Sequence, residues 1–317
     1  MSDPDRPVAT AGSPGTPADA AAERAALVAL IRTAGRPWHA HREMVERAGS
    51  VRAALERALA DEAGEAPPLP GLQPSNRRDA EALVSAALED IARWERSGLT
   101  LLTVLDDGYP HNLRLVWDQP PLIFVAGRLR EDDWRSVAVI GSRHASQAGI
   151  RAAGELAEHL VALGWTVISG LAAGIDTAAH RAALVAGGRT IAVVGTGLWR
   201  TYPPQNADLQ RLIAARCAVV SQFWPDSPPS RHSFPQRNAT MSGLARASVI
   251  VEASERSGAR VQARQALAHG RPVFLSERLL AQRWARDLQA RPGVHVYREP
   301  ADVTRVLGRL GDGELRG

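Results

Sequence analysis

Three glycine-bearing segments follow apolar runs in the middle of the chain and could together bind an anion. Gly141-Ser142-Arg143 follows the first run, and Ser146 is well placed to cap the helix after it. Ser169-Gly170 opens a second segment that continues to Gly174, and Gly195-Thr196-Gly197 forms a third. Glycine lets the backbone approach a phosphate, a helix N-terminus supplies N–H groups, and arginine supplies a charged fork. The three segments predict an anion-binding crevice.

A proline-rich segment further along the chain has an unusual composition. It contains Pro228, Pro229 and Pro235 among polar side chains. Proline fixes its own backbone angle and donates no backbone hydrogen bond, so the segment is predicted to be a stiff, extended loop. Asn238 is a good helix cap, and we expect a helix to run from it to Ala245.

The same segment carries side chains suited to a nucleic acid. Arg231 and Arg237 would bind phosphates, and Phe234 would stack on a base. The alternative is that Phe234 packs beneath the loop while the arginines face solvent. Arg260 and Arg264 lie one helical turn apart and form either a basic stripe or an ordinary solvated helix face.

Several enzyme classes are excluded or disfavoured by the residues present. The chain has no lysine, which excludes Walker-A and Schiff-base chemistry. Arg200 stands where a dinucleotide-binding turn would need its third glycine. His39 and His41 have no third metal ligand nearby, so neither a metal nor another cofactor is expected. Ser169 lacks the Gly-x-Ser-x-Gly context of a hydrolase nucleophile.

Two alternatives to a nucleic-acid-binding protein remain open. The first is a nucleotide-cleaving or nucleotide-sensing enzyme resembling the phosphoribohydrolases, in which Glu252 or Asp176 would act on a ribosyl bond. Their Pro-Gly-Gly-x-Gly-Thr-x-x-Glu motif is absent, and Asp176 is also suited to capping a helix. The second is that residues 23–130 form a partner-docking module and that the crevice is vestigial.

These side chains must be positioned by alternating strands and helices. Strands are predicted over residues 137–140, 166–168, 190–194, 218–221, 248–252 and 272–275, with helices over residues 149–163, 177–186, 208–215 and 259–269. Apolar strands joined by helices are typical of a parallel sheet buried on both faces. We therefore predict an α/β fold with a doubly wound, mostly parallel, extended Rossmann-like sheet, whose ligands bind at the carboxyl ends of its strands.

Other regions flank this sheet. Residues 1–22 are predicted to be a disordered tail, residues 23–98 a small helical domain with a loop over residues 61–75, and residues 99–300 the Rossmann-like domain. An arginine-rich helix over residues 276–291 and a short strand over residues 292–297 would close that domain. Residues 301–317 are expected to form a C-terminal helix or tail.

Charge is distributed unevenly along the 317 residues, and all 38 basic residues are arginine. Residues 136–276 carry 14 arginines and seven acidic residues, whereas residues 1–135 carry 16 arginines and 21 acidic residues. A polyanion is the natural partner of the basic middle segment.

Overall composition excludes other classes. The chain is 45% hydrophobic and 23% charged, which is typical of globular proteins. Its apolar runs are too short to span a membrane, and its first residues lack the pattern of a secretory signal. Cys217 is the single cysteine and cannot form an internal disulfide, so a cytoplasmic setting is expected.

Several of these motifs occur together, in the same order, in a known family. The motifs are Gly141-Ser142-Arg143, Ser169-Gly-Leu-Ala-Ala-Gly-Ile-Asp-Thr-Ala-Ala-His180, Tyr202-Pro-Pro-x-Asn206, Ser233-Phe-Pro-x-Arg-Asn238, Ser242-Gly243-Leu244 and Glu252-Ala-Ser-x-x-Ser-Gly-Ala259. From about Leu99 to Leu275 the chain resembles the DNA-processing protein A (DprA/Smf) family, as a shortened and diverged member.

The resemblance implies a Rossmann-like domain that binds single-stranded DNA in a basic pocket without catalysing a reaction. It also implies that the protein protects incoming strands during natural transformation and helps to load the RecA recombinase, as a homodimer. The motifs would supply the pocket residues Arg143, Ser169, Gly170, Phe234, Arg237 and Asn238. The charge and turn arguments add Gly141, Ser142, Gly174, Arg231 and Arg260.

Overall fold

The computed structural model describes residues 17–33, 38–63, 75–255 and 257–309. The chain divides into two compact units, residues 1–93 and 94–317. The boundary expected from the sequence, between residues 98 and 99, lies slightly later along the chain. Most of the predicted tail lies outside the described residues, but residues 17–22 are helical rather than disordered.

The described part of the first unit is helical. Its helices are α1 (Pro17–Thr33), α2 (Trp38–Ala48), α3 (Val51–Ala63) and α4 (Ser75–Arg96), the last of which continues into the second unit. Glu23 of α1 accepts a hydrogen bond of 2.8 Å from the backbone nitrogen of Val51 and thereby caps α3. α3 continues to Ala63, so residues 61–63 of the expected loop are helical, and residues 64–74 lie outside the described residues.

The second unit is built on a nine-stranded sheet. In spatial order its strands are β1 (Leu99–Thr103), β2 (Leu122–Gly127), β6 (Ala218–Ser221), β5 (Thr190–Val193), β4 (Thr166–Ser169), β3 (Ser136–Gly141), β7 (Ala247–Glu252), β8 (Val273–Ser276) and β9 (Val294–Tyr297). The strands from β6 to β9 are parallel, and β2 and β1 are antiparallel additions at one edge. The predicted α/β class with a mostly parallel sheet is confirmed.

The direction of winding changes at β3. From β3 the chain moves through β4, β5 and β6 to one side, and it then returns to β7, β8 and β9 on the other side. At such a switch the connections leave the neighbouring strand ends in opposite directions and create a crevice. The carboxyl ends of β3 and β7 are therefore where this sheet is expected to bind a ligand.

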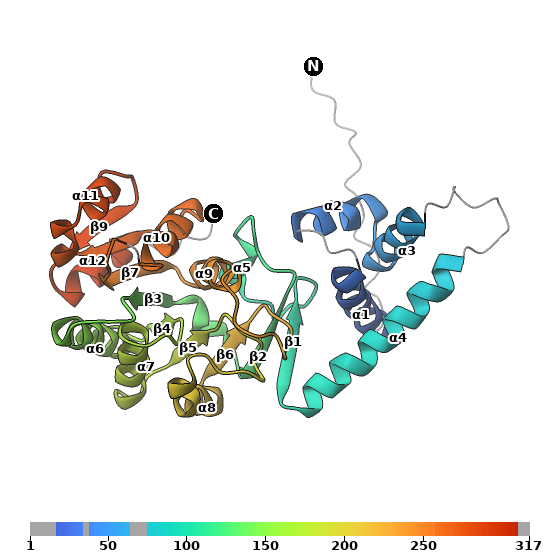
Figure 1. Ribbon diagram of the computed structural model, residues 1–317, viewed down its shortest axis with the longest axis horizontal. Helices are drawn as coiled ribbons and strands as arrows, with labels where there is room; N and C mark the ends of the chain where they lie inside the picture. The colour runs from blue at the N-terminus through green and yellow to red at the C-terminus, as the bar shows by residue number, and fades with distance from the viewer. Residues whose placement is uncertain (1–16, 34–37, 64–74, 256, 310–317) are drawn as a thin grey trace, which may run out of the picture. The chain divides into compact units, whose positions relative to one another are not determined.

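Helices cover both faces of the sheet (Figure 1). One face carries α6 (Gln147–Ala162), α7 (Ile175–Val185) and α12 (Pro300–Arg309). The other carries α5 (His111–Arg114), α9 (Ser233–Leu244), α10 (Ala259–Ala268) and α11 (Arg283–Gln289). A further helix, α8 (Ala207–Arg216), packs on β2, β5 and β6.

The side chains of the central strand, β3, alternate between two apolar cores. Val137 and Val139 join the core beneath α6 and α7, whereas Ala138 and Ile140 join the core beneath α9. Successive side chains of a strand point to opposite faces, so an unbroken apolar run is what a sheet covered on both faces requires.

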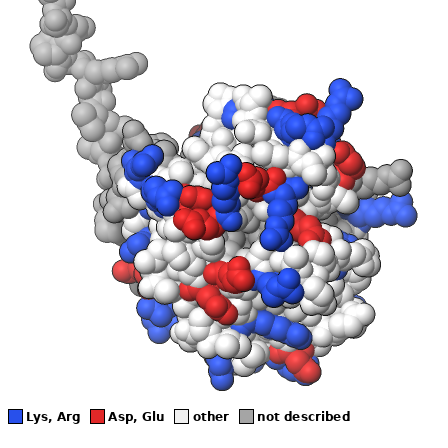
Figure 2. All heavy atoms as spheres, turned by 90° about the vertical axis from the view of Figure 1, so that its left-hand side faces the viewer, with Lys and Arg blue, Asp and Glu red and all other residues white. Residues whose placement is uncertain are grey.

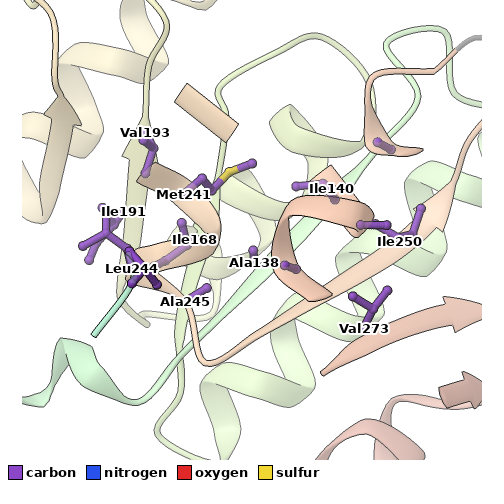
Figure 3. Close-up of a cluster of buried hydrophobic side chains, with 14 of the residues drawn as sticks. Ala138, Ile140, Ile168, Ile191, Val193, Met241, Leu244, Ala245, Ile250 and Val273 are labelled. Atoms are coloured by element: carbon purple, nitrogen blue, oxygen red, sulfur yellow. The ribbon is translucent and has the colours of Figure 1, made fainter. Parts of the chain in front are cut away.

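The second core fixes the position of α9. Met241 and Leu244 on this helix lie beside Ile168, Ile191 and Val193 of β4 and β5 (Figure 3). All five side chains are at least 95% removed from solvent. Burial of large aliphatic side chains stabilises a fold by about 1.5–3 kcal/mol each, so α9 is a firmly packed element.

An almost buried ion pair aligns the opposite, amino edge of the sheet. Asp133 lies in the short 3-10 helix η1 (Glu131–Trp134), and its Oδ2 is 2.7 Å from Nη2 of Arg189. The two side chains are only 11% and 14% exposed. Oδ1 of Asp133 also accepts a hydrogen bond of 3.2 Å from the Thr166 hydroxyl. One carboxylate thus aligns the starts of β3, β4 and β5.

Replacing Asp133 by alanine is expected to lower the free energy of unfolding by about 3 kcal/mol, because it leaves the Arg189 guanidinium nearly buried without its carboxylate. Urea unfolding measures this loss. Asp132→Ala is the matched control: Asp132 pairs with Arg130, and both side chains are about 60% exposed, so its loss should stay within about 0.5 kcal/mol. Equal losses in the two variants would contradict the assignment.

Candidate functional site

A cavity of about 400 Å³ lies at the carboxyl ends of β3 and β7, at the switch point of the sheet. The loop after β3, the helix α9 and the segment from β7 into α10 form most of its wall. Its lining residues are Ile140, Gly141, Ser142, Arg143, His144, Ala172, Asp176, Arg237, Asn238, Met241, Ser254, Ser257, Gly258, Ala259 and Gln262. The structure therefore brings together Gly141, Ser142, Arg143, Arg237 and Asn238 of the predicted site.

The segment predicted to be an extended loop is non-helical over residues 227–232 but helical from Ser233 onward. α9 begins at Ser233, so Phe234, Arg237 and Asn238 lie within its first two turns, and Asn238 is not the cap. Proline is tolerated in a first turn because the N–H groups there have no partner within the helix. The backbone nitrogen of Ser233 donates to the Ser230 hydroxyl at 3.0 Å and anchors the start. The predicted contacts Phe234, Arg237 and Asn238 thus lie on a packed helix, whereas Arg231 lies before it.

Arg237 lines the cavity, yet its side chain is almost fully engaged inside the protein. Nη1 donates to the carbonyl oxygens of Gly170 and Val193, and Nε donates to Oδ1 of Asn238 at 3.1 Å. Burial lowers the pKa of Arg237, and the nearby Asp176 carboxylate opposes that shift. A Cβ at Gly170 would collide with Nη1, so this glycine makes room for the guanidinium. Arg237 ties α9 to the ends of β4 and β5.

Asp176 is the buried acidic counterpart in the first turn of α7. Its Oδ2 accepts hydrogen bonds from the backbone nitrogens of Gly170 at 3.2 Å and Ala172 at 3.3 Å. Burial raises the pKa of Asp176 above its ordinary value, although Arg237 and the two backbone donors lower it in part. The carboxylate closes the turn between β4 and α7 and occupies its N–H groups.

A second carboxylate lies beside the N-terminus of α6. Oε1 of Glu252 accepts a hydrogen bond of 2.9 Å from the backbone nitrogen of Ser146, and Oε2 accepts one from the Ser146 hydroxyl. Ser146 in turn caps the helix by accepting from the Gly149 nitrogen at 3.0 Å, as predicted. The predicted cap thus takes the Gly149 N–H, and the Glu252 carboxylate lies at the same helix end, where its charge opposes a bound phosphate.

The predicted glycines serve close packing between two loops. Gly174 has a φ of +77°, and a Cβ there would collide with the carbonyl oxygen of Ser142. A Cβ on Gly141 would lie 2.6 Å from the Glu252 carbonyl oxygen. Ser169 is fully buried and donates to the Val139 carbonyl at 2.6 Å, so Ser169 and Gly174 support the cavity from outside its lining.

An aromatic row leads toward the cavity along the sheet edge. The Arg143 guanidinium lies 5.1 Å from the centre of the Phe234 ring, a cation–π distance. On α9 the Phe234 ring is half-buried, and its centre is 5.6 Å from that of Tyr202, which is 40% exposed. The Tyr202 ring, the Phe234 ring and the exposed Arg143 guanidinium thus lie next to one another in a row.

Two predicted phosphate ligands lie outside the cavity lining. Arg231 is exposed just before α9. Arg260 donates to the carbonyl oxygen of Glu255, lies 3.4 Å from its carboxylate, and covers the Trp284 ring at 5.6 Å. Arg231 and Arg260 therefore do not line the cavity that Arg143 lines.

Charges elsewhere on the second unit are mixed. Figure 2 shows basic and acidic side chains interspersed on the side that lies at the left of Figure 1. Around α12, for example, Arg298 pairs with Glu277 and Arg305 pairs with Asp302, both at 2.7 Å. A face of alternating charge attracts a polyanion weakly, so this face is a poor candidate for the site.

Comparison with known proteins adds to this geometry. A family model described as DNA recombination-mediator protein A matches residues 100–301, which contain the whole cavity lining. The chain belongs to this family. The resemblance stated from the sequence motifs is confirmed.

Individual relatives agree with the family assignment. DNA processing protein DprA from Streptococcus pneumoniae is 42% identical over 172 residues, which cover 54% of this chain and 61% of that protein. Its solved structure matches with a TM-score of 0.61 at 30% identity, over 80% of this chain and 92% of that one. DNA processing protein A from Helicobacter pylori, solved to describe its single-stranded DNA binding mode, matches the fold with a TM-score of 0.58 at 24% identity, over 67% and 96% of the two chains. The chain spans less than two thirds of the length of the first curated relatives it matches.

The sequence does not predict two residues of the site. Tyr202 belongs to the Tyr-Pro-Pro motif, and an aromatic side chain in a family motif is the signal that points to binding. Gln262 lines the cavity and has nothing in its surrounding sequence to distinguish it from the other glutamine of α10, Gln265.

A serine–histidine–aspartate chain lies elsewhere in the second unit. The Ser242 hydroxyl is 2.8 Å from Nδ1 of His269, whose Nε2 is 2.7 Å from Oδ1 of Asp118. Such a chain activates the nucleophile of many hydrolases. Ser242 is fully buried here, so no substrate reaches it, and the chain joins α9 and α10 to the loop before β2.

Metal and membrane sites were also sought. Among the described residues, no group of three or more histidine, cysteine, aspartate or glutamate side chains is arranged to hold a metal ion. Within the same ranges, no helix has the length and apolar character needed to cross a membrane.

His180, on α7, makes the free energy of unfolding depend on pH. The ring is fully buried beside the Thr190 hydroxyl, and burial lowers the pKa of His180 from 6.5 to about 3. Between these values the unfolded chain binds a proton that the folded protein does not, so stability falls as the pH falls. From pH 7 to pH 5 the loss due to this residue is expected to be about 2 kcal/mol, measured by urea unfolding.

His180→Gln is the comparison variant for this measurement. Asp176, whose raised pKa acts in the opposite direction, is present in both proteins. The variant should lose about 2 kcal/mol less than the parent over the same pH interval. Parallel pH profiles would show that His180 is not held neutral by burial.

Proposed function

We propose that this chain binds single-stranded DNA at the carboxyl edge of its sheet. The observation that carries the proposal is the row formed by Tyr202, Phe234 and Arg143, which leads to the cavity between β3 and β7. Bases of a single strand expose their faces and stack on aromatic side chains, while arginine attracts the backbone. Family membership and the excess of arginine over residues 136–276 support the same ligand.

The role of the bound complex follows from the family. We infer that the protein protects incoming strands and helps to load the RecA recombinase during DNA uptake and recombination, as a homodimer and without catalysing a reaction. The cytoplasm is the expected setting, which the single, buried Cys217 supports. The description of the Helicobacter pylori protein as a single-stranded DNA binder is consistent with this assignment.

The nucleotide-cleaving alternative has less support. Glu252 would have to act on a ribosyl bond, but its carboxylate is bound to the nitrogen and hydroxyl of Ser146. Asp176 lines the cavity, but its Oδ2 already accepts two backbone hydrogen bonds. Both carboxylates have structural partners, which favours binding over hydrolysis.

Arg143 supplies the test of the electrostatic contact. Removing one phosphate contact should weaken binding to every sequence and flatten the log–log salt dependence by about 0.7. Fluorescence anisotropy of a labelled oligonucleotide, titrated at several salt concentrations, measures both effects in Arg143→Ala. Arg216→Ala is the control, since Arg216 is exposed at the opposite edge of the sheet and should change neither quantity. Unchanged affinity and salt dependence in Arg143→Ala would remove this residue from the interface.

Phe234 supplies the test of stacking. Phe234→Ala should weaken binding by about tenfold, because one base–aromatic stack contributes about 1–3 kcal/mol, while the salt dependence stays the same. Trp117→Ala is the matched aromatic control: Trp117 is 66% exposed and lies beside His269, after the end of α10. If Phe234→Ala binds as tightly as the parent, the ring packs on Gly195 without contacting DNA.

A further inference from the structure

A second cavity, of about 430 Å³, lies toward the amino edge of the sheet, on the face that carries α9. The loop between β1 and α5, the segment from β2 into η1 and the last residue of α9 form most of its wall. None of the residues proposed to contact DNA lines this amino-edge cavity. Its volume lies within the range of about 300–1,000 Å³ typical of sites for small organic ligands.

The floor of the amino-edge cavity is apolar. Ile168 of β4, Ile191 of β5 and Leu244 of α9 pack together there (Figure 3). Tyr109 adds its ring to the wall, and its hydroxyl donates to a backbone carbonyl at 2.5 Å, so the ring offers the cavity only apolar surface. Such a floor fits the apolar body of an organic ligand better than a hydrated inorganic ion.

Asn112 supplies a hydrogen-bond acceptor within this lining. The side chain is only 4% exposed, and its Nδ2 donates to the carbonyl oxygens of Trp134 and Leu244, each at 2.8 Å. Both hydrogens of the amide are thereby used, and no described residue donates to its Oδ1. A nearly buried acceptor without a donor is costly, so a ligand that brings an N–H group is favoured.

The mouth of the cavity carries uncompensated negative charge. Asp107 and Glu131 line it from two different segments, and both side chains are exposed. Neither carboxylate forms an ion pair with a described residue. Arg130 also lines the mouth, but its guanidinium is bound to Asp132 at 3.0 Å. The mouth therefore attracts a cation and repels a phosphate.

We propose that the amino-edge cavity binds a small organic cation. Its apolar body lies on Ile168, Ile191 and Leu244, its charged nitrogen donates to Oδ1 of Asn112, and the two carboxylates at the mouth stabilise its charge. The polar groups converge on one cavity, which suits a small molecule. The inference goes beyond the proposed function and does not depend on it, because the two sites share no residue.

Three probes with the same phenethyl body and different charge test the site: phenethylammonium, phenethyl alcohol and phenylpropionate. Isothermal titration of the full chain at low salt measures their affinities. Phenethylammonium should bind most tightly, with a dissociation constant on the order of 1 mM for so small a ligand. The alcohol should bind about fivefold more weakly, and the carboxylate should bind most weakly.

A double variant, Asp107→Asn with Glu131→Gln, removes both charges and keeps the shapes of the side chains. It should bind phenethylammonium about fivefold more weakly than the parent and the alcohol equally well. Glu155→Gln with Glu158→Gln is the matched control, because both residues are exposed on α6, which covers the other face of the sheet. The control should bind all three probes as the parent does, and both double variants should melt with the parent.

Several results would overturn the proposal. The parent might not bind phenethylammonium at ten times the expected dissociation constant, or it might bind the ammonium and the alcohol equally. Equal weakening in the two double variants would show that general charge, rather than Asp107 and Glu131, attracts the cation. A larger gain in affinity for a thymidine oligomer in the first double variant than in the control would place DNA at this cavity instead.

Discussion

The buried guanidinium of Arg237 holds the site together. It draws two strand-end carbonyl oxygens, from Gly170 and Val193, toward one side chain on α9. Those carbonyls belong to the ends of β4 and β5. The position of α9, which carries Phe234, is therefore fixed on the sheet by hydrogen bonds as well as by apolar packing. Asp176 offsets part of the electrostatic cost of burying this charge. Phe234 and Asn238, three residues before and one after Arg237, take their positions from it.

A second constraint is that the protein places its own carboxylates beside the strand-to-helix turns of the sheet. In many doubly wound folds the helix that follows a strand points its N-terminus at a ligand phosphate. Here the Glu252 carboxylate bonds to the cap residue of α6, Ser146, and Asp176 closes the turn before α7. A ligand is thereby directed away from the individual turns and toward the gap between β3 and β7. Its phosphates must then be met by an exposed side chain such as Arg143.

How far the sequence predicts this arrangement depends on the range of the interactions involved. The parallel strands are predicted well because a sheet buried on both faces needs unbroken apolar runs, as in residues 137–140 and 248–252. The start of α9 is missed because three prolines indicate a loop. Pro235 nevertheless lies in the first turn of the helix, where proline is tolerated. Gln262 is missed for a different reason: whether a glutamine lines a cavity depends on residues distant in sequence. Arg237 and Arg260 likewise differ in burial and pairing, which their shared residue type does not reveal.

The extended layout of the site favours a polymer over a free nucleotide. A mononucleotide needs one cavity, and the groups that bind it converge on that cavity. Tyr202 and Phe234 continue the contact surface beyond the cavity lining, with neighbouring ring centres 5.6 Å apart and one ring 40% exposed. An aromatic pair outside the pocket makes no contact with a nucleotide that is held entirely within it. Successive bases of a strand can use both faces in turn while Arg143 holds the backbone between them and the cavity.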